Sequence, residues 1–251
     1  MGAPGFDDSP TEQPEVTDNP PRRITFVYPY YENPEFLKKQ ILGWRRFPAQ
    51  LRDLIDVIIV DDGSPKHPAK DVIVDSIWPM HLRLFRIDVD VRWNWLAARN
   101  IGMHHTMTQW NVLTDMDHVV LHNVATSLTR RDYRPDTIYR FGRKESNGLI
   151  IHPHPNSMFM TRDVFWAVGG YDEALSGHYG TDGDWRRRCA KTARIRLLPE
   201  RLERHEYEGD SSTTAYKRKQ PEDAGKKAII ARRGPGWRPL TLSFPYHEVR
   251  R

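Results

Sequence analysis

The chain has 251 residues, of which 38% are hydrophobic and 11% aromatic, enough for one large domain or two small ones with a packed core. Its single cysteine, Cys189, excludes an internal disulfide framework, and no apolar run is long enough to cross a membrane, so we expect a soluble, cytoplasmic protein. The net charge of +5 is distributed unevenly along the chain.

The two ends of the chain differ in charge from the middle. Residues 1–21 hold five acidic residues, no lysine or arginine and several prolines, which predicts a disordered acidic tail. Residues 211–251 hold ten lysines and arginines against three acidic residues and form a basic C-terminal extension. This composition is typical either of a segment that meets a polyanion or of a solvated surface. We expect residues 22–210 to fold as one domain.

Apolar runs alternate with helical patterns over the first half of this domain. Buried strands are predicted at residues 24–28, 54–60, 82–89 and just before Asp115. A helix is predicted from the N-cap Asn33 to about Arg46, and another over residues 95–107. Continuously apolar strands that alternate with helices predict an α/β sheet with helices on both faces.

The second half is less regular. Strands are predicted at residues 137–141, 157–160, 194–199 and 202–207, helices at 161–166 and 181–191, and a polar loop at 142–156. A tight turn is expected at residues 169–173, and a last strand that docks on the domain at residues 239–245.

Three polar turns follow predicted strands, at residues 29–32, 61–64 and 115–117. In open α/β sheets ligands bind beyond the carboxyl ends of the strands, so these turns should share one crevice. In an extended backbone Asp115 and Asp117 would point to the same side, and two carboxylates held that close require a cation such as Mg²⁺ or Mn²⁺. Asp-x-Asp is also common in polar turns, so the pattern depends on its surroundings.

Five stretches in this order resemble the family 2 glycosyltransferases of the GT-A fold. They are Val60-Asp-Asp-Gly-Ser64, Ala98-Arg-Asn-Ile-Gly102, Leu113-Thr-Asp-Met-Asp117, Gly169-Gly-Tyr-Asp-Glu173 and Gly180-Thr-Asp-Gly-Asp-Trp185. The resemblance implies a Rossmann-like nucleotide-binding half with a mixed central sheet. It also implies a metal-dependent, inverting transfer of a sugar from a nucleoside-diphosphate donor, with a UDP-sugar expected, to an acceptor hydroxyl.

The resemblance also implies roles for single residues. Asp117 would bind Mn²⁺ or Mg²⁺ directly and Asp115 would reach the ribose or a metal-bound water. His205 stands where relatives often have a third ligand, although it is equally interpreted as an ordinary strand histidine. The general base is usually an acid within Glu-Asp at the start of a helix; here the pair is Thr181-Asp182, so Asp182 takes this position, with Asp184 in reserve.

Nucleotide recognition falls to the early turns in this family. Donor-binding candidates are Pro29, Tyr30, Glu32, Asp61, Asp62, Arg99 and Asp115. Tyr30 and Tyr31 should point to opposite sides, so we expect only one to face the ligand. Trp93 and Trp95 are interpreted as packing residues, and His152 and His154 as part of an ordinary Pro-rich loop.

Three alternatives remain. A nucleotidyltransferase would have a Gly-rich phosphate loop after the first strand, and Tyr28-Pro-Tyr-Tyr-Glu32 has no glycine. A non-catalytic protein that binds nucleotide sugars or polyanions would not require Asp115, Asp117 and Asp182 together. For the acceptor we favour a glycan or lipid-linked glycan, with DNA bearing a hydroxymethylated base as the alternative that the basic extension suggests.

Overall fold

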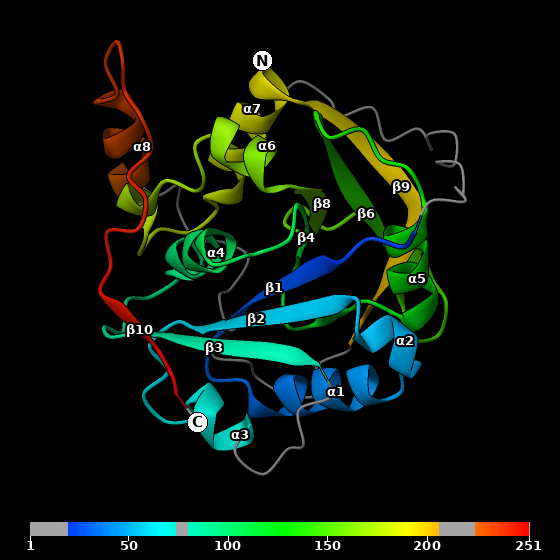
Figure 1. Cartoon of the computed structure of the whole chain (residues 1–251). Coiled ribbons are helices and arrows are strands. Elements are labelled where there is room, and N and C mark those ends of the chain that lie inside the picture. Colours follow the sequence, from blue (N-terminus) through cyan, green and yellow to red (C-terminus); the bar gives the residue numbers. More distant parts are fainter. Residues whose placement is uncertain (1–19, 74–79, 206–223, 251) are drawn as a thin grey trace.

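A single mixed sheet forms the centre of the computed structural model, which describes residues 20–73, 80–205 and 224–250 (Figure 1). The strands, in chain order, are β1 (Ile24–Tyr30), β2 (Ile55–Asp61), β3 (His81–Ile87), β4 (Trp110–Leu113), β5 (His118–Val119), β6 (Thr137–Glu145), β7 (Ile150–Ile151), β8 (Met158–Thr161), β9 (Arg194–Arg204) and β10 (Tyr246–Glu248). Their order across the sheet is β10-β3-β2-β1-β4-β8-β6-β9-β5, and β7 pairs with β6.

Helices cover both faces of this sheet. They are α1 (Pro34–Arg45), α2 (Ala49–Arg52), α3 (Ala69–Ile73), α4 (Trp95–His104), α5 (His122–Arg130), α6 (Arg162–Ala167), the 3₁₀ helix η1 (Glu173–Leu175), α7 (Asp182–Thr192) and α8 (Ala224–Ala231). Alternate residues of β1 divide between the two faces: Phe26 and Tyr28 belong to the core cluster that includes α1, whereas Val27 belongs to the one that includes α4. The α/β fold with a central mixed sheet and a single domain is therefore confirmed.

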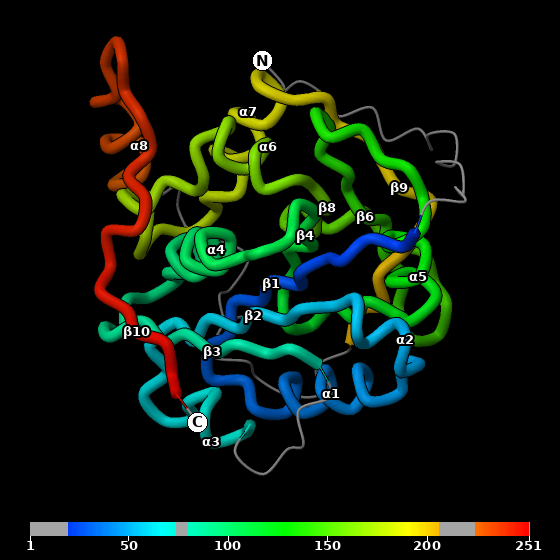
Figure 2. The backbone as a smooth tube through the Cα atoms, in the orientation of Figure 1, coloured from blue at the N-terminus to red at the C-terminus, as the bar shows by residue number. Residues whose placement is uncertain are grey.

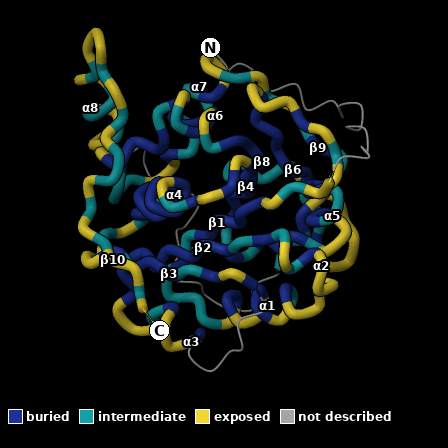
Figure 3. The backbone as a smooth tube through the Cα atoms, in the orientation of Figure 1, coloured by how far each residue is buried: buried dark blue, intermediate teal, exposed yellow. Residues whose placement is uncertain are grey.

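The central strands are buried, and exposed positions concentrate on the outer helices and loops (Figure 3). Asn33 caps α1 as expected, because its side chain accepts a hydrogen bond from the backbone N–H of Phe36 at 3.2 Å. Among the described residues, no helix is both long and apolar enough to span a membrane.

The parallel strands β1, β2, β3 and β4 place the predicted turns at one edge of the sheet. Tyr30, the last residue of β1, is in register with Asp61, the last residue of β2. Leu113 ends β4 beside Val27 of β1. The turns after β1, β2 and β4 therefore leave the sheet at the same edge, as the sequence predicted.

The second half differs from the prediction in several places, of which three concern predicted strands and loops. The polar loop is shorter than expected, because β6 continues to Glu145 and forms a hairpin with β7. The two strands expected near Pro199 are one strand, β9. The register against β6 shifts between Arg140–Leu197 and Gly142–Arg201, so a bulge accommodates the proline within the strand.

The third difference concerns the end of the chain. Residues 239–245 form no strand; the strand that joins the sheet is β10, which pairs antiparallel with β3. Pro239 and Pro245 bracket this stretch, and a proline cannot donate a ladder hydrogen bond. Figure 2 shows the segment from α8 to β10 running down one side of the molecule. The predicted acidic tail lies outside the described residues except for residues 20 and 21.

Candidate active site

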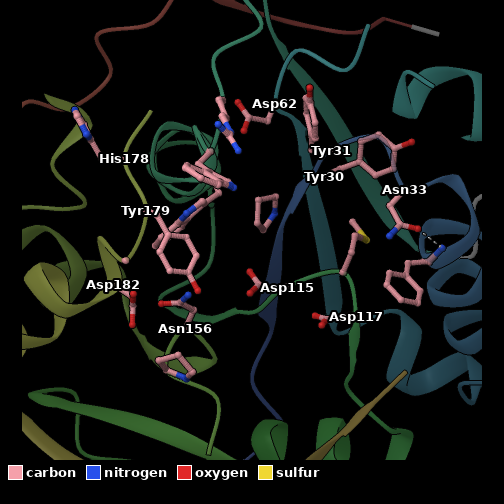
Figure 4. A pocket seen from close by; sticks show the side chains of 18 of the residues that line it. Tyr30, Tyr31, Asn33, Asp62, Asp115, Asp117, Asn156, His178, Tyr179 and Asp182 are labelled. Atoms are coloured by element: carbon pink, nitrogen blue, oxygen red, sulfur yellow. Dashed lines mark hydrogen bonds between the residues drawn. The ribbon is translucent and has the colours of Figure 1, made fainter. Parts of the chain in front are cut away.

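A cavity of about 1120 Å³ opens at the edge where β1, β2 and β4 end. Its wall combines the turns after these strands with residues from the loop before α7 and from the end of β9. The lining residues are Pro29, Tyr30, Tyr31, Asn33, Phe36, Asp62, Asp90, Arg92, Trp93, Trp95, Asp115, Met116, Asp117, Pro155, Asn156, His178, Tyr179, Gly180, Asp182, Arg204 and His205. In Figure 4, Asp182 lies on one side of this space and Asp117 on the other, with Asp115 and Asn156 between them.

Seven of the residues predicted for the site line this cavity, and four do not. The seven are Pro29, Tyr30, Asp62, Asp115, Asp117, Asp182 and His205. The four that do not are Glu32, Asp61, Arg99 and Asp184.

Two of the four support the turns around the cavity. Glu32 has a positive φ of 48°, and its carboxylate accepts hydrogen bonds from the backbone N–H groups of Lys66 and His67 at 2.7 and 3.1 Å. Asp61 is buried and accepts hydrogen bonds from the backbone of Ser64 and Ala69 at 2.9 and 2.8 Å.

Arg99 is fully buried and connects Asp115 to the rest of the domain. Its guanidinium makes a short ion pair with Asp115 and donates hydrogen bonds to the Asn156 carbonyl at 2.7 Å and to the Tyr171 hydroxyl at 3.2 Å. Arg99 therefore acts on the cavity through Asp115 rather than by lining it.

The geometry of the two predicted metal-binding acids differs from the expectation. Strand β4 ends at Leu113, and Met116 and Asp117 lie in a turn, so the two aspartates do not extend from one straight strand. Asp115 pairs with Arg99, and Asp117 lies 2.7 Å from Nδ1 of His118. Each carboxylate therefore has a neighbouring protein group, and the binding of a cation by the two aspartates stays a prediction.

Asp117 is held in its ionised form by its surroundings. Burial acts to raise the pKa of its carboxyl group, but the hydrogen bond with His118 and the nearby charges outweigh burial and lower the pKa below its usual value. A carboxylate that remains ionised is the form that binds a metal ion.

His154 is a largely buried residue, with 14% of its side chain exposed, and it lies beside the cavity, although its sequence context suggested only an ordinary loop. Its ring stacks on that of His118 with centroids 4.2 Å apart, and its Nε2 lies 3.4 Å from Asp115. Burial lowers the pKa of His154 to about 3, so the ring is neutral at physiological pH. The Pro-rich sequence around His154 did not predict these contacts, because they form only when the fold brings the loop beside Asp115 and His118.

The chemistry of the donor groups fits a divalent cation, although they are not gathered as a finished site. Within the described ranges, no three His, Cys, Asp or Glu side chains form a group that could hold a metal ion. His205 lines the cavity, its backbone N–H bonds to the Asp117 carbonyl at 2.8 Å, and its buried Nε2 has no hydrogen-bond partner. Burial, together with the charge of Lys39, lowers the pKa of His205 and keeps the ring in the neutral form that binds metals.

The wall formed by the ends of β1 and β2 carries aromatic rings and a buried acid. Tyr30 donates a hydrogen bond from its hydroxyl to the His67 carbonyl at 2.6 Å, and Tyr31 donates one to Asp90 at 3.1 Å. Both tyrosines line the cavity, but Tyr30 is buried with only 1% of its surface exposed, whereas Tyr31 is half-buried, so the expectation that only one of them faces a ligand stays a prediction. Tyr31 follows the last residue of β1, where the alternation of a strand no longer applies. Asp62 is buried beside them, and its Oδ1 has no hydrogen-bond partner.

Asp182 and Asp184 occupy different environments at the start of α7. Asp182 is partly exposed and lines the cavity. Asp184 is buried and forms ion pairs with Arg188 and Arg233 at 3.1 and 2.5 Å. Thr181 occupies the N-cap position without a side-chain cap hydrogen bond, so helix capping does not account for this residue.

The cavity also contains residues for which the sequence predicted no role in binding. Trp93, interpreted as a packing residue, has a positive φ of 52° and lines the cavity with Tyr179, their rings 5.5 Å apart. Asn156 lines it as well, and its buried Oδ1 has no hydrogen-bond partner. These residues come from separate loops, so no local sequence pattern identifies them.

Comparisons with known proteins identify the family. Residues 25–183 match the model of the glycosyl transferase family 2. A search among curated protein sequences gave no match. Among solved structures, S. aureus TarS in complex with UDP-GlcNAc is similar, with a TM-score of 0.59 at 14% identity over 78% of this chain and 62% of that one.

Two further solved structures have the same fold at similarly low identity. The mannosyltransferase PcManGT from Pyrobaculum calidifontis, in complex with GDP-Man and Mn²⁺, gives a TM-score of 0.59 at 14% identity over 82% of this chain and 63% of that one. GalNAc-T7 with UDP, GalNAc and Mn²⁺ gives 0.57 at 14% identity over 75% and 45%.

The present chain thus spans less than two thirds of the length of these proteins. The family match covers more than half of the chain and includes the turns that form the cavity and the start of α7. The chain belongs to the glycosyl transferase family 2 and has the GT-A fold.

Proposed function

We propose that the chain transfers a sugar from a nucleoside-diphosphate donor, with a UDP-sugar expected, to a hydroxyl group of a glycan or lipid-linked glycan, with inversion at the anomeric carbon. The observation that carries the proposal is one cavity lined both by the turns at the ends of β1, β2 and β4 and by Asp182. Its volume of about 1120 Å³ is large enough for a donor together with part of an acceptor. The nucleotides and nucleotide sugars named for the solved structures support this class of donor.

The nucleoside would bind against the wall formed by the ends of β1 and β2. Tyr30 and Tyr31 line this wall, with Tyr31 the more exposed of the two, and the unpartnered Oδ1 of Asp62 can accept a hydrogen bond from an N–H of the base. The diphosphate would then lie toward Asp115 and Asp117, which line the cavity farther along the same edge.

Asp115 and Asp117, with His205 beside them, would hold Mn²⁺ or Mg²⁺. Such ions commonly bind through one or two carboxylates together with substrate phosphates, so a finished three-residue site is not required before the donor arrives. The chemistry supplied by the bound ion is compensation of the negative charge that develops on the departing nucleoside diphosphate. Arg99 would keep Asp115 in place for this purpose.

Asp182 would act as the general base. As the acceptor oxygen bonds to the anomeric carbon, Asp182 takes the hydroxyl proton and the bond from that carbon to the diphosphate oxygen breaks. An inverting reaction requires base and leaving group on opposite sides of the sugar. The position of Asp182 across the cavity from Asp117 supports this arrangement (Figure 4). Asp184 is the less favourable candidate because arginines engage its buried carboxylate.

The proposal is tested first by binding and then by turnover. A panel of nucleotide sugars is added with and without Mn²⁺, and a donor that binds only the folded protein raises the melting temperature. Asp117→Asn should lose most of the metal-dependent part of this increase. Asp182→Asn should retain it, because the base acts on the acceptor, while turnover falls by about two to four orders of magnitude.

Asp163→Asn provides a matched control, because Asp163 is an exposed aspartate in the first turn of another helix, α6. It should bind and turn over donor like the wild type. Transfer by Asp117→Asn in EDTA at the wild-type rate would contradict the metal assignment. A turnover loss confined to Asp184→Asn would contradict the choice of Asp182.

A further inference from the structure

The C-terminal segment, residues 224–250, lies beyond the residues matched by the family model, which end at 183. Its helix α8 nevertheless packs beside η1, and its strand β10 joins the edge of the central sheet (Figure 1). Two of its basic side chains contact the elements that carry Asp182 to the cavity.

Arg233 is the first of these contacts. Its guanidinium forms ion pairs with Asp184 through Nη1 and with Asp172 through Nη2, each at 2.5 Å. All three side chains are largely buried, with exposed fractions of 13% for Arg233, 6% for Asp184 and 1% for Asp172. The guanidinium also stacks 3.8 Å from the ring centroid of Trp237, so its fork is fixed in orientation. Loss of Arg233 would leave two buried carboxylates without this partner.

Asp184 lies in the first turn of α7, so its ion pair with Arg233 connects the C-terminal segment to the start of this helix. It also pairs with Arg188, whose guanidinium donates hydrogen bonds to the carbonyls of Val168 and Gly170 at 2.9 and 2.6 Å. Burial acts to raise the pKa of Asp184, but the hydrogen bond from Arg233 and the charge of Arg188 outweigh it, so the pKa lies below its usual value. The first turn of α7, which begins with Asp182, is thereby tied to the turn after α6 and to the C-terminal segment.

Lys226 is the second contact. Its ammonium group donates hydrogen bonds to the backbone carbonyls of Tyr179 and Gly180 at 2.8 and 3.2 Å. Tyr179 and Gly180 line the cavity, and Asp182 follows two residues later. Helix α8 of the C-terminal segment is thus hydrogen-bonded to the backbone of the loop that lines the cavity just before Asp182.

The C-terminal segment is itself anchored next to these contacts. The carboxylate of Glu173 accepts hydrogen bonds from the backbone N–H groups of Leu242 and Ser243, both at 2.7 Å. Asp172 accepts one from Leu240 at 3.0 Å. Arg233 and Lys226 therefore extend from a segment that is fixed to the same turn that α7 contacts.

We propose that Arg233 and Lys226 are positioning residues: they brace residues 177–181 and the first turn of α7, and so set the direction in which Asp182 faces the cavity. The proposal rests on the proposed role of Asp182. It makes the C-terminal segment part of the catalytic unit, with these two positive charges used inside the molecule rather than for binding a partner.

The brace is tested in the full-length protein with Arg233→Gln and with Lys226→Met. The matched control is Arg232→Gln. Arg232 is the exposed neighbour of Arg233, and the substitution removes the same charge. Hydrogen exchange measured by mass spectrometry should become at least about tenfold faster at residues 177–192 in Arg233→Gln, with residues 24–61 unchanged, because the local opening is no longer restrained. The control should exchange like the wild type.

Turnover then separates positioning from simple support of the fold. In Arg233→Gln, kcat should fall by about 10- to 100-fold while KM for the donor stays within about twofold, the pattern of a displaced catalytic group. Arg233→Lys should recover part of kcat because it keeps the charge but not the fork. Lys226→Met removes hydrogen bonds of an exposed ammonium group, so it reports on the brace even where Arg233→Gln does not fold.

Wild-type exchange at residues 177–192 in both variants would overturn the brace, and faster exchange with unchanged kcat would overturn the positioning role. If the wild-type protein transfers no sugar, the proposed function fails. The exchange result then still supports or overturns the brace.

Discussion

Asp61 and Asp62 are adjacent buried acids with different surroundings. Asp61 accepts two backbone hydrogen bonds and pairs with Arg86 at 2.9 Å. Asp62 faces the cavity with one oxygen unpartnered. Burial first, and then the charges of Asp61 and Asp90, raise the pKa of Asp62 well above its usual value. An ionised carboxylate in this position destabilises the folded state. A ligand whose N–H donates a hydrogen bond to Oδ1 would relieve this cost.

This difference gives a prediction for the pH dependence of stability. Because the pKa of Asp62 is higher in the folded than in the unfolded state, its contribution to stability is complete below about pH 4, the value for an unfolded aspartate. The contribution is lost as the pH rises through the folded-state pKa. Asp62→Asn removes this loss, so its melting temperature should exceed that of the wild type increasingly above pH 4.

The same variant should bind nucleotide about tenfold or more weakly, because an N–H of the bound base bonds more strongly to an ionised carboxylate than to the neutral amide of asparagine. Thermal unfolding across pH 4–8 and nucleotide titration check the two parts. Asp61→Asn is the control. It should be less stable than the wild type because it removes the ion pair with Arg86 and weakens the hydrogen bond that holds the turn at Ser64. A constant difference in stability between Asp62→Asn and the wild type at every pH would contradict the assignment.

At the scale of elements, the turn between α6 and η1 joins three parts of the molecule. Gly169 and Gly170 both have positive φ, +92° and +63°. A Cβ atom on Gly170 would lie 2.9 Å from the Asn100 side chain and 3.2 Å from Thr241 of the C-terminal segment. The Gly-Gly pair thus permits both the left-handed backbone and the close approach of the segment that supports α7.

Gly170→Ala should therefore lower the free energy of unfolding by about 1–3 kcal/mol, through backbone strain and crowding. Gly43→Ala is the matched control, since Gly43 has the helical backbone of α1 and open space where an alanine Cβ would lie. It should leave stability unchanged or raise it by about 0.5–1 kcal/mol. Urea denaturation of the two variants measures the difference. Equal free energies of unfolding for the two variants would show that the turn tolerates a side chain, so that backbone strain and crowding do not explain why it contains glycine.

The elements that the sequence predicted well are those in which local pattern and tertiary contacts agree. The apolar runs of β1 and β2 and the Asn33-Pro34 start of α1 required no knowledge of distant contacts. The continuous β9 was missed because Pro199 signals a strand end, and only pairing with β6 shows that a bulge absorbs it. The prediction for residues 239–245 failed because two prolines prevent ladder pairing and the strand forms at the next residues.

The site was predictable to the extent that its residues follow strand ends or begin helices. Asp115 and Asp117 were found because they follow a predicted strand, and Asp182 because the family resemblance implies an acid at a helix start; all three line the cavity. His154 and Asn156 belong to a polar loop that is held by hydrogen bonds of His154 with Ser157 and of the Asn156 carbonyl with Arg99. Residues of this kind are identified only when the fold brings their loop to the sheet edge.

At the scale of the whole molecule, the distribution of charge bears on the acceptor. The basic extension suggested a polyanion, but Arg233 and Lys226 contact the domain in the structure. Arg83 pairs with Glu248 of β10 at 2.7 Å, so the end of the chain also contributes an acid to the contact. Exposed basic residues of the C-terminal segment, such as Arg232 and Arg238, remain accessible to a partner. The basic stretch Lys217-Arg218-Lys219 lies outside the described residues.

Deleting the chain from residue 211 would not test polyanion binding alone. The deletion would remove Arg233 and Lys226, which contact the domain, together with the surface charges. We propose to neutralise Lys217, Arg218 and Lys219 to glutamine in the full-length chain instead. If these residues bind phosphates, the slope of log affinity for duplex DNA against log salt should decrease by about 0.9 for each phosphate interaction that the substitutions remove. The variant leaves the ion pairs of Arg233 in place, so turnover on a glycan acceptor should be unchanged.

We expect the full-length protein to bind duplex DNA weakly, to lose that binding by about 200 mM salt, and to transfer no sugar to DNA that carries a hydroxymethylated base. In a duplex the hydroxymethyl group lies in the major groove, so transfer would require a protein surface that enters the groove or a flipped base that reaches Asp182. A glycan or lipid-linked glycan needs neither, because its hydroxyl groups are free to enter the cavity. Salt titration and sugar-transfer assays on both acceptors, with the wild type and the triple glutamine variant, separate the two classes. Sugar transfer to hydroxymethylated DNA that weakens in the variant would instead establish DNA as the acceptor.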